Sequence, residues 1–175
     1  STMKKDDPYF LGAIGGFGGK EPNNFMKKTD LAIAIGTKLA DFTTGSWANF
    51  ENPNFKLVSI NVSRFDANKH MAQSIVGDAK VCLQDLTLAL GNWKAEDDWH
   101  KKSRIAVNAW NNYLEKESGP TNQELPSYAH VAGAIYRKSE PSDIAVTAAG
   151  GLVGEVLQVW RPRELNTHET EWGFS

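Results

Sequence analysis

The chain has 175 residues, of which 41% are hydrophobic and 23% are charged, and its formal net charge is −2 at pH 7. These values are typical of an ordinary globular protein with one sizeable core, and they give no electrostatic basis for binding nucleic acid or an anionic membrane. No apolar run approaches the roughly 20 residues that a membrane-spanning helix needs. The single cysteine, Cys82, excludes an internal disulfide, so we expect a cytoplasmic protein with this thiol in its core.

A glycine-dense loop occupies residues 12–19. It does not follow a clear strand, and its spacing departs from the G-x-G-x-x-G of dinucleotide-binding loops. It is not a phosphate loop either, because Lys20 is followed by Glu21 and not by Ser or Thr. Two interpretations remain open. We favour a loop that lets the backbone pass close to a neighbouring segment over a cradle for a nucleotide.

Three short segments predict a parallel sheet. The first, 31–35, has no polar residue, which is typical of a strand buried on both faces, and 56–62 and 74–78 follow as further strands. The elements expected between and after them are a short helix capped by Asn23 or Asn24 and ending near Lys28, a loop or short helix over 64–72, and a helix over 79–90 that Gly91 ends. This order indicates an α/β fold with a Rossmann-like, doubly wound parallel sheet.

Polar residues follow the carboxyl ends of these strands, where open α/β sheets bind their ligands. Gly36 ends the first strand, Asn61 lies near the end of the second, and Asp78 ends the third. A carboxylate at this edge could bind a ribose hydroxyl. It could equally cap the helix that begins at Ala79, and we favour the cap.

A boundary is expected after the long helix over 94–116, because 117–126 concentrates Gly, Pro and polar residues. The sequence therefore predicts a domain over 1–116, a linker over 117–126 and the start of a second α/β unit over 127–175. In that unit we expect a helix from Ser127 to Lys138 with Val131, Ile135 and Tyr136 facing inward.

The second unit also contains the pattern of an anion site. A buried strand is expected over 143–147, a glycine turn over 148–151, and a helix over 152–160. Free N–H groups at such a helix start favour a phosphate group. Glu155, one turn into this helix, could be a general acid or simply an acid that the helix dipole favours.

The residues by themselves do not form a complete catalytic constellation. The four histidines are scattered and have no cysteine partners, so no metal site is expected. No serine lies in a nucleophile elbow.

Several motifs are similar to those of the thiamine-diphosphate (ThDP) enzymes of the acetohydroxyacid synthase type. They lie at 30–47, 60–62, 147–151 with 154–155, 160–163 and 171–175. Residues 41–47, which read DFTTGSW, most resemble the branch that hydrolyses trihydroxycyclohexane-1,2-dione in myo-inositol breakdown. The resemblance covers about Phe10 to Ser175. It implies the middle domain, of the FAD/NAD-binding type, and only the opening of the third of three α/β domains.

The resemblance also implies site residues. The turn that approaches the cofactor diphosphate would be Ala149, Gly150, Gly151 and Leu152, and Ser175 would begin the loop that supports the pyrimidine. Relatives carry Gln-His where this chain has Gly151-Leu152, which puts a side-chain role there in doubt. Acetohydroxyacid synthases bind FAD in this domain, whereas this branch is not expected to need it. We therefore expect a vestigial nucleotide site at the matching positions Gly15, Gly36, Thr37, Lys38, Asn61 and Asp78.

The function implied by the resemblance is ThDP- and Mg²⁺-dependent cleavage of a ring C–C bond by the full-length parent. Both ends of the sequence look cut, and neither the domain with the activating glutamate nor a Gly-Asp-Gly…Asn motif is present. We therefore expect an inactive fragment without bound cofactor, whose partners are the missing N- and C-terminal domains, the cyclic dione and further copies in a homo-oligomer. The alternatives are an acetolactate synthase-like or 2-oxoacid decarboxylase ThDP enzyme, and a non-catalytic module that binds FAD or ADP.

Overall fold

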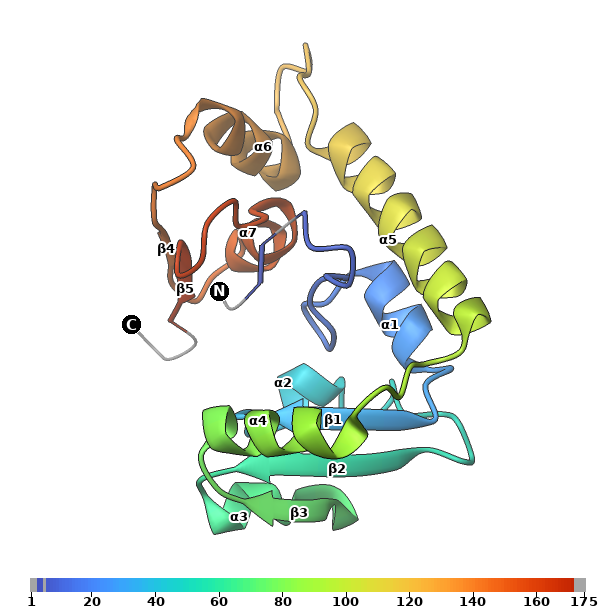
Figure 1. Cartoon of the computed structure of the whole chain (residues 1–175). Coiled ribbons are helices and arrows are strands. Elements are labelled where there is room, and N and C mark those ends of the chain that lie inside the picture. Colours follow the sequence, from blue (N-terminus) through green and yellow to red (C-terminus); the bar gives the residue numbers. More distant parts are fainter. Residues whose placement is uncertain (1–2, 5, 172–175) are drawn as a thin grey trace.

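The computed structural model of the chain describes residues 3–4 and 6–171, and it has two lobes with helix α5 along one side (Figure 1). The sheet lobe contains β1 (Leu31–Ile35), α2 (Asp41–Thr44), β2 (Lys56–Asn61), α3 (Arg64–Ala67), a 3₁₀ turn (Lys69–Met71), β3 (Gln73–Val76) and α4 (Ala79–Leu90). The helical lobe contains α1 (Lys20–Met26), α5 (Asp97–Glu117), α6 (Tyr128–Lys138), β4 (Ala145–Thr147), α7 (Val153–Val159) and β5 (His168–Thr170).

The three strands of the sheet lobe are parallel and lie in the order β1-β2-β3. Leu31 pairs with Lys56, and Val58 pairs with Gln73, so all three strands end at the same edge. Helix α4 lies across one face of this sheet (Figure 1). The predicted strands are confirmed within two residues, and so is the parallel α/β class of the fold.

Strand β1 is not buried on both faces, so that prediction is wrong. Its side chains alternate between the two faces of the sheet. Ala32 and Ala34 belong to a core with Leu57, whereas the large side chains of the other face, on Leu31, Ile33 and Ile35, are 40–48% exposed. Helix α4 packs mainly on β2, so the large side chains of the edge strand β1 stay partly exposed.

Helix α1 begins earlier than the sequence predicts. Gly19 is its N-cap, so Asn23 and Asn24 lie inside the helix and cap nothing. Pro22 fits the first turn because that turn needs no N–H donor. The cap predicted for α4 is confirmed: Asp78 Oδ1 accepts hydrogen bonds from the N–H groups of the first turn, at 2.9 and 3.1 Å.

The glycine loop at 12–19 brings the backbone into close contact with α2, as the favoured interpretation predicts. Gly15 N–H donates to Asn23 Oδ1 at 2.8 Å, and Asn23 Nδ2 donates to Gly15 O at 3.0 Å. Gly16 N–H donates to Phe42 O at 2.7 Å. Gly15 has φ +96°, and a Cβ on it would overlap the Phe42 carbonyl, so only glycine fits this position.

The same loop joins the two lobes. The Phe17 ring stacks on the Phe42 ring of the sheet lobe, with 5.4 Å between their centroids. Phe17 O accepts a hydrogen bond from Gln158 Nε2 of the helical lobe at 3.2 Å. Gly19 lies so close to the Trp110 ring that a Cβ there would overlap it. Residues 15–19 are therefore a packing joint between α2, α5 and α7.

The core of the helical lobe is built from α5, α6, α7 and the residue after α7. Its buried members are Trp110, Leu114, Ala132, Val156, Val159 and Trp160. None of the helices in the described part of the chain has the length and apolar character that a bilayer crossing demands.

Helix α6 has the N-cap that the sequence predicts but a different inward face. Ser127 Oγ accepts a hydrogen bond from the His130 N–H at 3.3 Å. Val131 and Ile135 are 38% and 54% exposed, so the prediction that they face inward is wrong. The buried face carries Ala132 and Gly133 instead.

Small residues are needed on this face of α6 because it meets the end of α5. A Cβ on Gly133 would overlap the Ser118 carbonyl oxygen. The same oxygen accepts a hydrogen bond from Arg137 Nη1 at 2.5 Å, and Ser118 is only 9% exposed. The junction between the two helices is therefore closely packed.

The small sheet of the helical lobe pairs β4 with β5 in parallel. The predicted strand over 143–147 is shorter than expected, and it is not buried, because Ile144 is 62% and Val146 is 74% exposed. Strand β5 is absent from the prediction because it reads His-Glu-Thr and has no apolar side chain to mark it. Thr147 Oγ1 and Thr170 Oγ1 lie 3.2 Å apart across this pair.

We expect Gly15→Ala to lower the free energy of unfolding by roughly 3 kcal/mol or more, because the new Cβ overlaps the Phe42 carbonyl and φ is positive. The matched control is Gly36→Ala, at φ +64° with no atom near the new Cβ, which should cost only about 1–2 kcal/mol. Urea unfolding followed by circular dichroism measures both. Equal losses for the two variants would contradict the role of the loop.

Candidate functional site

The glycine turn of the second unit lies between β4 and α7, where the sequence predicts it. Residues 148–152 are exposed. Gly150 has φ +152°, and no atom lies near the position of its missing Cβ. Leu152, the N-cap of α7, makes no side-chain capping hydrogen bond. The main chain of this turn is therefore open to a ligand. Ser175, the other predicted cofactor residue, lies outside the described residues.

A cleft of about 950 Å³ lies beside this turn, between α1, α5, α6 and α7. Tyr128 lines it and contacts the turn, because a Cβ on Gly151 would lie 3.3 Å from the Tyr128 ring. Glu155 lines it from the first turn of α7. The sequence singled out Glu155 but not Tyr128, whose place depends on how α6 packs against the turn.

The charges near the turn are mostly negative. The charged residues that line the cleft are Lys20, Glu21, Glu117 and Glu155. No lysine or arginine occurs between Thr147 and Trp160. In the described part of the chain, no group of three or more His, Cys, Asp or Glu side chains could hold a metal ion.

The turn therefore fits a diphosphate in shape but not in charge. Its exposed glycine backbone admits close approach of an anion. Lys20 is outnumbered by three glutamates in the lining of the cleft, so a bound diphosphate would need its own metal to balance its charge. This chain offers the backbone part of such a site.

The predicted nucleotide residues are brought to one edge of the three-stranded sheet. Gly36 N–H donates to Ile60 O at 2.9 Å, and Gly77 N–H donates to Asn61 O at 3.2 Å. Gly36, Thr37, Asn61 and Asp78 are thereby gathered where the parallel strands end. Gly15 lies against α2, the helix that follows this edge.

The polar side chains at this edge already have partners in the chain itself. Asn61 Nδ2 donates to Thr37 O at 3.0 Å, and Asn61 Oδ1 accepts from the Ser63 N–H at 2.9 Å. Asp78 is engaged as the cap of α4. These contacts hold the loops in place, and the vestigial nucleotide site stays a prediction.

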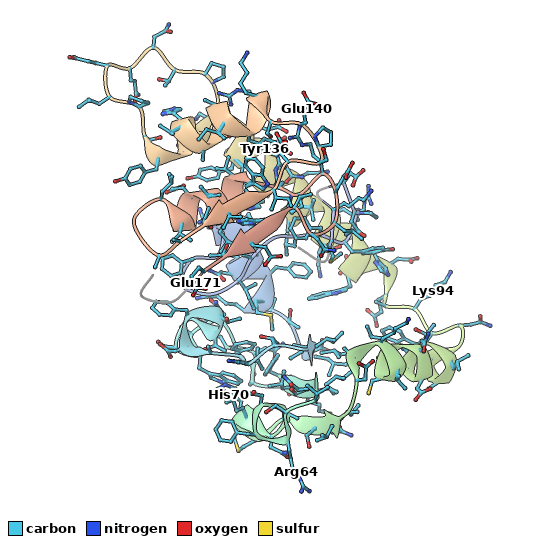
Figure 2. The ribbon with its side chains drawn as sticks, turned by 90° about the vertical axis from the view of Figure 1, so that its left-hand side faces the viewer. Arg64, His70, Lys94, Tyr136, Glu140 and Glu171 are labelled. Atoms are coloured by element: carbon cyan, nitrogen blue, oxygen red, sulfur yellow. The ribbon has the colours of Figure 1, made fainter. Side chains whose placement is uncertain are left out.

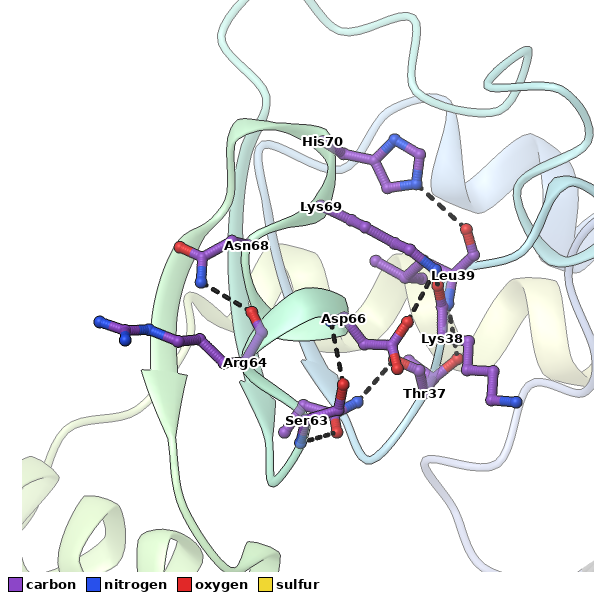
Figure 3. Close-up of polar contacts among 10 residues, drawn as sticks. Thr37, Lys38, Leu39, Ser63, Arg64, Asp66, Asn68, Lys69 and His70 are labelled. Carbon is purple, nitrogen blue, oxygen red and sulfur yellow. Dashed lines mark hydrogen bonds and ion pairs between the residues drawn. The ribbon is translucent and has the colours of Figure 1, made fainter.

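A cluster of charged residues fixes the loop that contains Lys38 (Figure 3). Lys69 Nζ lies 2.7 Å from Asp66 Oδ1 and donates to Lys38 O at 3.2 Å. The hydrogen bond from Lys69 holds the pKa of Asp66 below its usual range. His70 has φ +57°, places Nε2 3.1 Å from Leu39 O and stacks on a tryptophan of the sheet lobe.

The helical lobe contains the second titrating group with a shifted pKa. His168 of β5 is half-buried, and burial lowers the pKa of its imidazole, because desolvation disfavours the charged form. Its Nε2 lies 3.3 Å from Thr170 Oγ1. His168 belongs to the helical lobe and His70 to the sheet lobe, which Figure 2 shows as the lower part of the molecule.

The comparison with protein families identifies the first half of the chain. Residues 1–86 match the family model described as thiamine pyrophosphate enzyme, central domain. This part of the chain is therefore similar to that family. Thiamine pyrophosphate is another name for ThDP, so the family resemblance read from the motifs is confirmed. The match ends within α4, inside the range 1–116 that the sequence predicts for this domain. The limits at 117–126 and 127–175 stay predictions.

Curated relatives extend the likeness to the whole chain. It is 29% identical over 198 residues to 3D-(3,5/4)-trihydroxycyclohexane-1,2-dione hydrolase of Clostridium perfringens. It is 31% identical to the proteins of the same name from Clostridium botulinum and Bacillus anthracis. Each match covers 100% of this chain and 31% of the relative, so the chain spans about a third of the length of these relatives.

We expect stability to fall as the pH drops below about 6.5, the ordinary pKa of histidine, and part of this loss to come from His168. Between the lowered folded-state pKa and about 6.5 the unfolded chain binds more protons, so unfolding becomes easier as pH falls through that window. His168→Gln cannot titrate and should show a shallower slope in urea unfolding across this range. The other histidines titrate in both proteins, so an unchanged slope in the variant would contradict the assignment.

Proposed function

We propose that this chain is part of a ThDP-dependent hydrolase that cleaves a ring C–C bond of trihydroxycyclohexane-1,2-dione in myo-inositol catabolism. The observation that carries the proposal is the 29–31% identity to hydrolases of that name over the full length of the chain. The residues 41–47, DFTTGSW, support the same branch. The chain would supply the middle domain and the opening of the cofactor domain.

The role of this chain in the parent is to hold and position. Ala149, Gly150, Gly151 and Leu152 would hold the cofactor diphosphate through the exposed main chain of the turn. When bound, ThDP supplies a carbanion that attacks a carbonyl, with Mg²⁺ balancing its diphosphate. Tyr128 would support the turn through its contact with Gly151.

The acidic cleft explains why the isolated chain should not bind the cofactor. A diphosphate at the turn would meet a cleft in which Lys20 is outnumbered by Glu155 and two further glutamates. Like charges at short range oppose binding. Mg²⁺ and the remaining domains of the parent, together with further copies in a homo-oligomer, would therefore complete the site.

The two alternatives have less support. None of the relatives reported above is named as an acetolactate synthase or a 2-oxoacid decarboxylase. A non-catalytic FAD or ADP module would use Asn61 and Asp78, whose side chains already bind the protein's own backbone. FAD or ADP should therefore leave the melting temperature of the chain unchanged.

The full-length parent should open the cyclic dione in a ThDP- and Mg²⁺-dependent reaction and should turn over pyruvate at least about 100-fold more slowly, a difference of roughly 2.7 kcal/mol in barrier. Product analysis with both substrates measures this. In the same protein, Gly150→Ala should raise the ThDP concentration for half-maximal activity, because a Cβ is strained at φ +152°. Gly91→Ala, at φ +54° with open space, is the matched control. Preference for pyruvate would refute the proposal.

A calorimetric titration of the isolated chain with ThDP should give no binding tighter than about 1 mM, whether or not Mg²⁺ is present. The reason is that the turn supplies only backbone donors beside an acidic cleft. Tight, Mg²⁺-dependent binding would contradict the expectation that this chain holds only part of the site. It would leave the assignment of the parent's reaction untouched.

A further inference from the structure

A second cavity, of about 290 Å³, lies between the N-terminal loop, α5, the end of α7 and β5. It is separate from the glycine turn and the acidic cleft. Its walls are mainly apolar and include Phe10, Trp110 and Trp160, and its polar side chains include Arg161 and His168. Its size is at the small end for a ligand pocket, and an apolar lining with a few polar groups is typical of one.

Arg161 is short of acceptors. Its side chain is only 16% exposed, and its sole carboxylate partner in the described part of the chain is Glu115, at 3.7 Å. Glu115 is itself 70% exposed, so solvent weakens this pair. Arg161 Nη1 donates to Asn111 Oδ1 at 2.5 Å. Arg161 Nε is buried and has no hydrogen-bond partner among the described residues.

A largely buried guanidinium with an unpaired Nε–H favours an added anion. Buried charges in proteins are normally paired, because an unpaired one loses its hydration without compensation. Arginine has five N–H donors arranged to bind a carboxylate. None of the described residues that line this cavity is an aspartate or a glutamate, so a ligand carboxylate would meet no like charge in its walls.

We propose that this cavity binds a small monocarboxylate with an apolar body. The carboxylate pairs with Arg161, and the apolar body packs against the rings of Trp110 and Trp160. His168 and Thr170 add polar groups on the β5 side. This site is independent of the proposed cofactor turn and of the reaction of the parent.

The test uses sodium benzoate as the probe and benzylamine, of similar shape and opposite charge, as its control. We expect benzoate to bind the chain with a Kd of about 1 mM or tighter in calorimetry. It should also shift the NMR signals of the Trp110 and Trp160 indole N–H groups. Benzylamine and inorganic phosphate should bind at least about tenfold more weakly, the first for its charge and the second for its lack of an apolar body.

Variants locate the site. Arg161→Met should weaken benzoate binding at least about tenfold. Arg104→Met makes the same substitution at an exposed position and should leave benzoate binding unchanged. Glu115→Gln removes the competing carboxylate and should tighten binding about twofold, and Glu117→Gln, outside this cavity, should not. The exposed Glu115 keeps the test informative even if Arg161→Met fails to fold. Absence of benzoate binding at millimolar concentration, equal binding of benzylamine, or no response to Glu115→Gln would overturn the proposal.

Discussion

The amide side chain of Asn23 holds three separate segments of the chain together. Its oxygen accepts hydrogen bonds from Gly15 N–H at 2.8 Å and from Asn49 Nδ2 at 2.9 Å, and its nitrogen donates to Gly15 O. Asn49 is only 5% exposed, and an unpaired polar group at such a position would be costly. Helix α1, the glycine loop and the segment after α2 are therefore stable only as a set, and the packing of Phe17 between the lobes follows from it.

Elements with a strong local signal could be predicted from the sequence. The apolar run of β1, the periodic helix α4 and the caps at Asp78 and Ser127 depend on neighbouring residues, and the structure confirms them. Short elements without such a signal were missed, such as α2 with its four residues and β5. The buried face of an element was also hard to predict. Ala34 faces the core while Ile33 is exposed, because that outcome depends on which distant segment covers the strand.

The candidate site likewise has parts that could be predicted from the sequence and parts that could not. Its glycine turn could be found because strand, glycines and helix follow one another in the sequence, and the edge with Asn61 and Asp78 could be found because parallel strands end together. The contact of Tyr128 with Gly151 and the poorly paired charge of Arg161 could not, because both arise from helices that meet only in the folded chain. The sequence also could not show that the Asn61 amide donates a hydrogen bond to the backbone carbonyl of Thr37.

The closed junction between α5 and α6 decides where the molecule could bend. Gly133 packs against the Ser118 carbonyl oxygen, and Arg137 donates a hydrogen bond to it. These contacts hold the start of the Gly- and Pro-rich stretch after α5 against α6, so this stretch is a poor hinge. Helix α5, with 21 residues, is thereby fixed to α6 at its C-terminal end. Rotation of one lobe against the other would have to bend the chain at both of its crossings, residues 27–30 between α1 and β1 and residues 91–96 between α4 and α5. Such a rotation would also have to separate the stacked rings of Phe17 and Phe42.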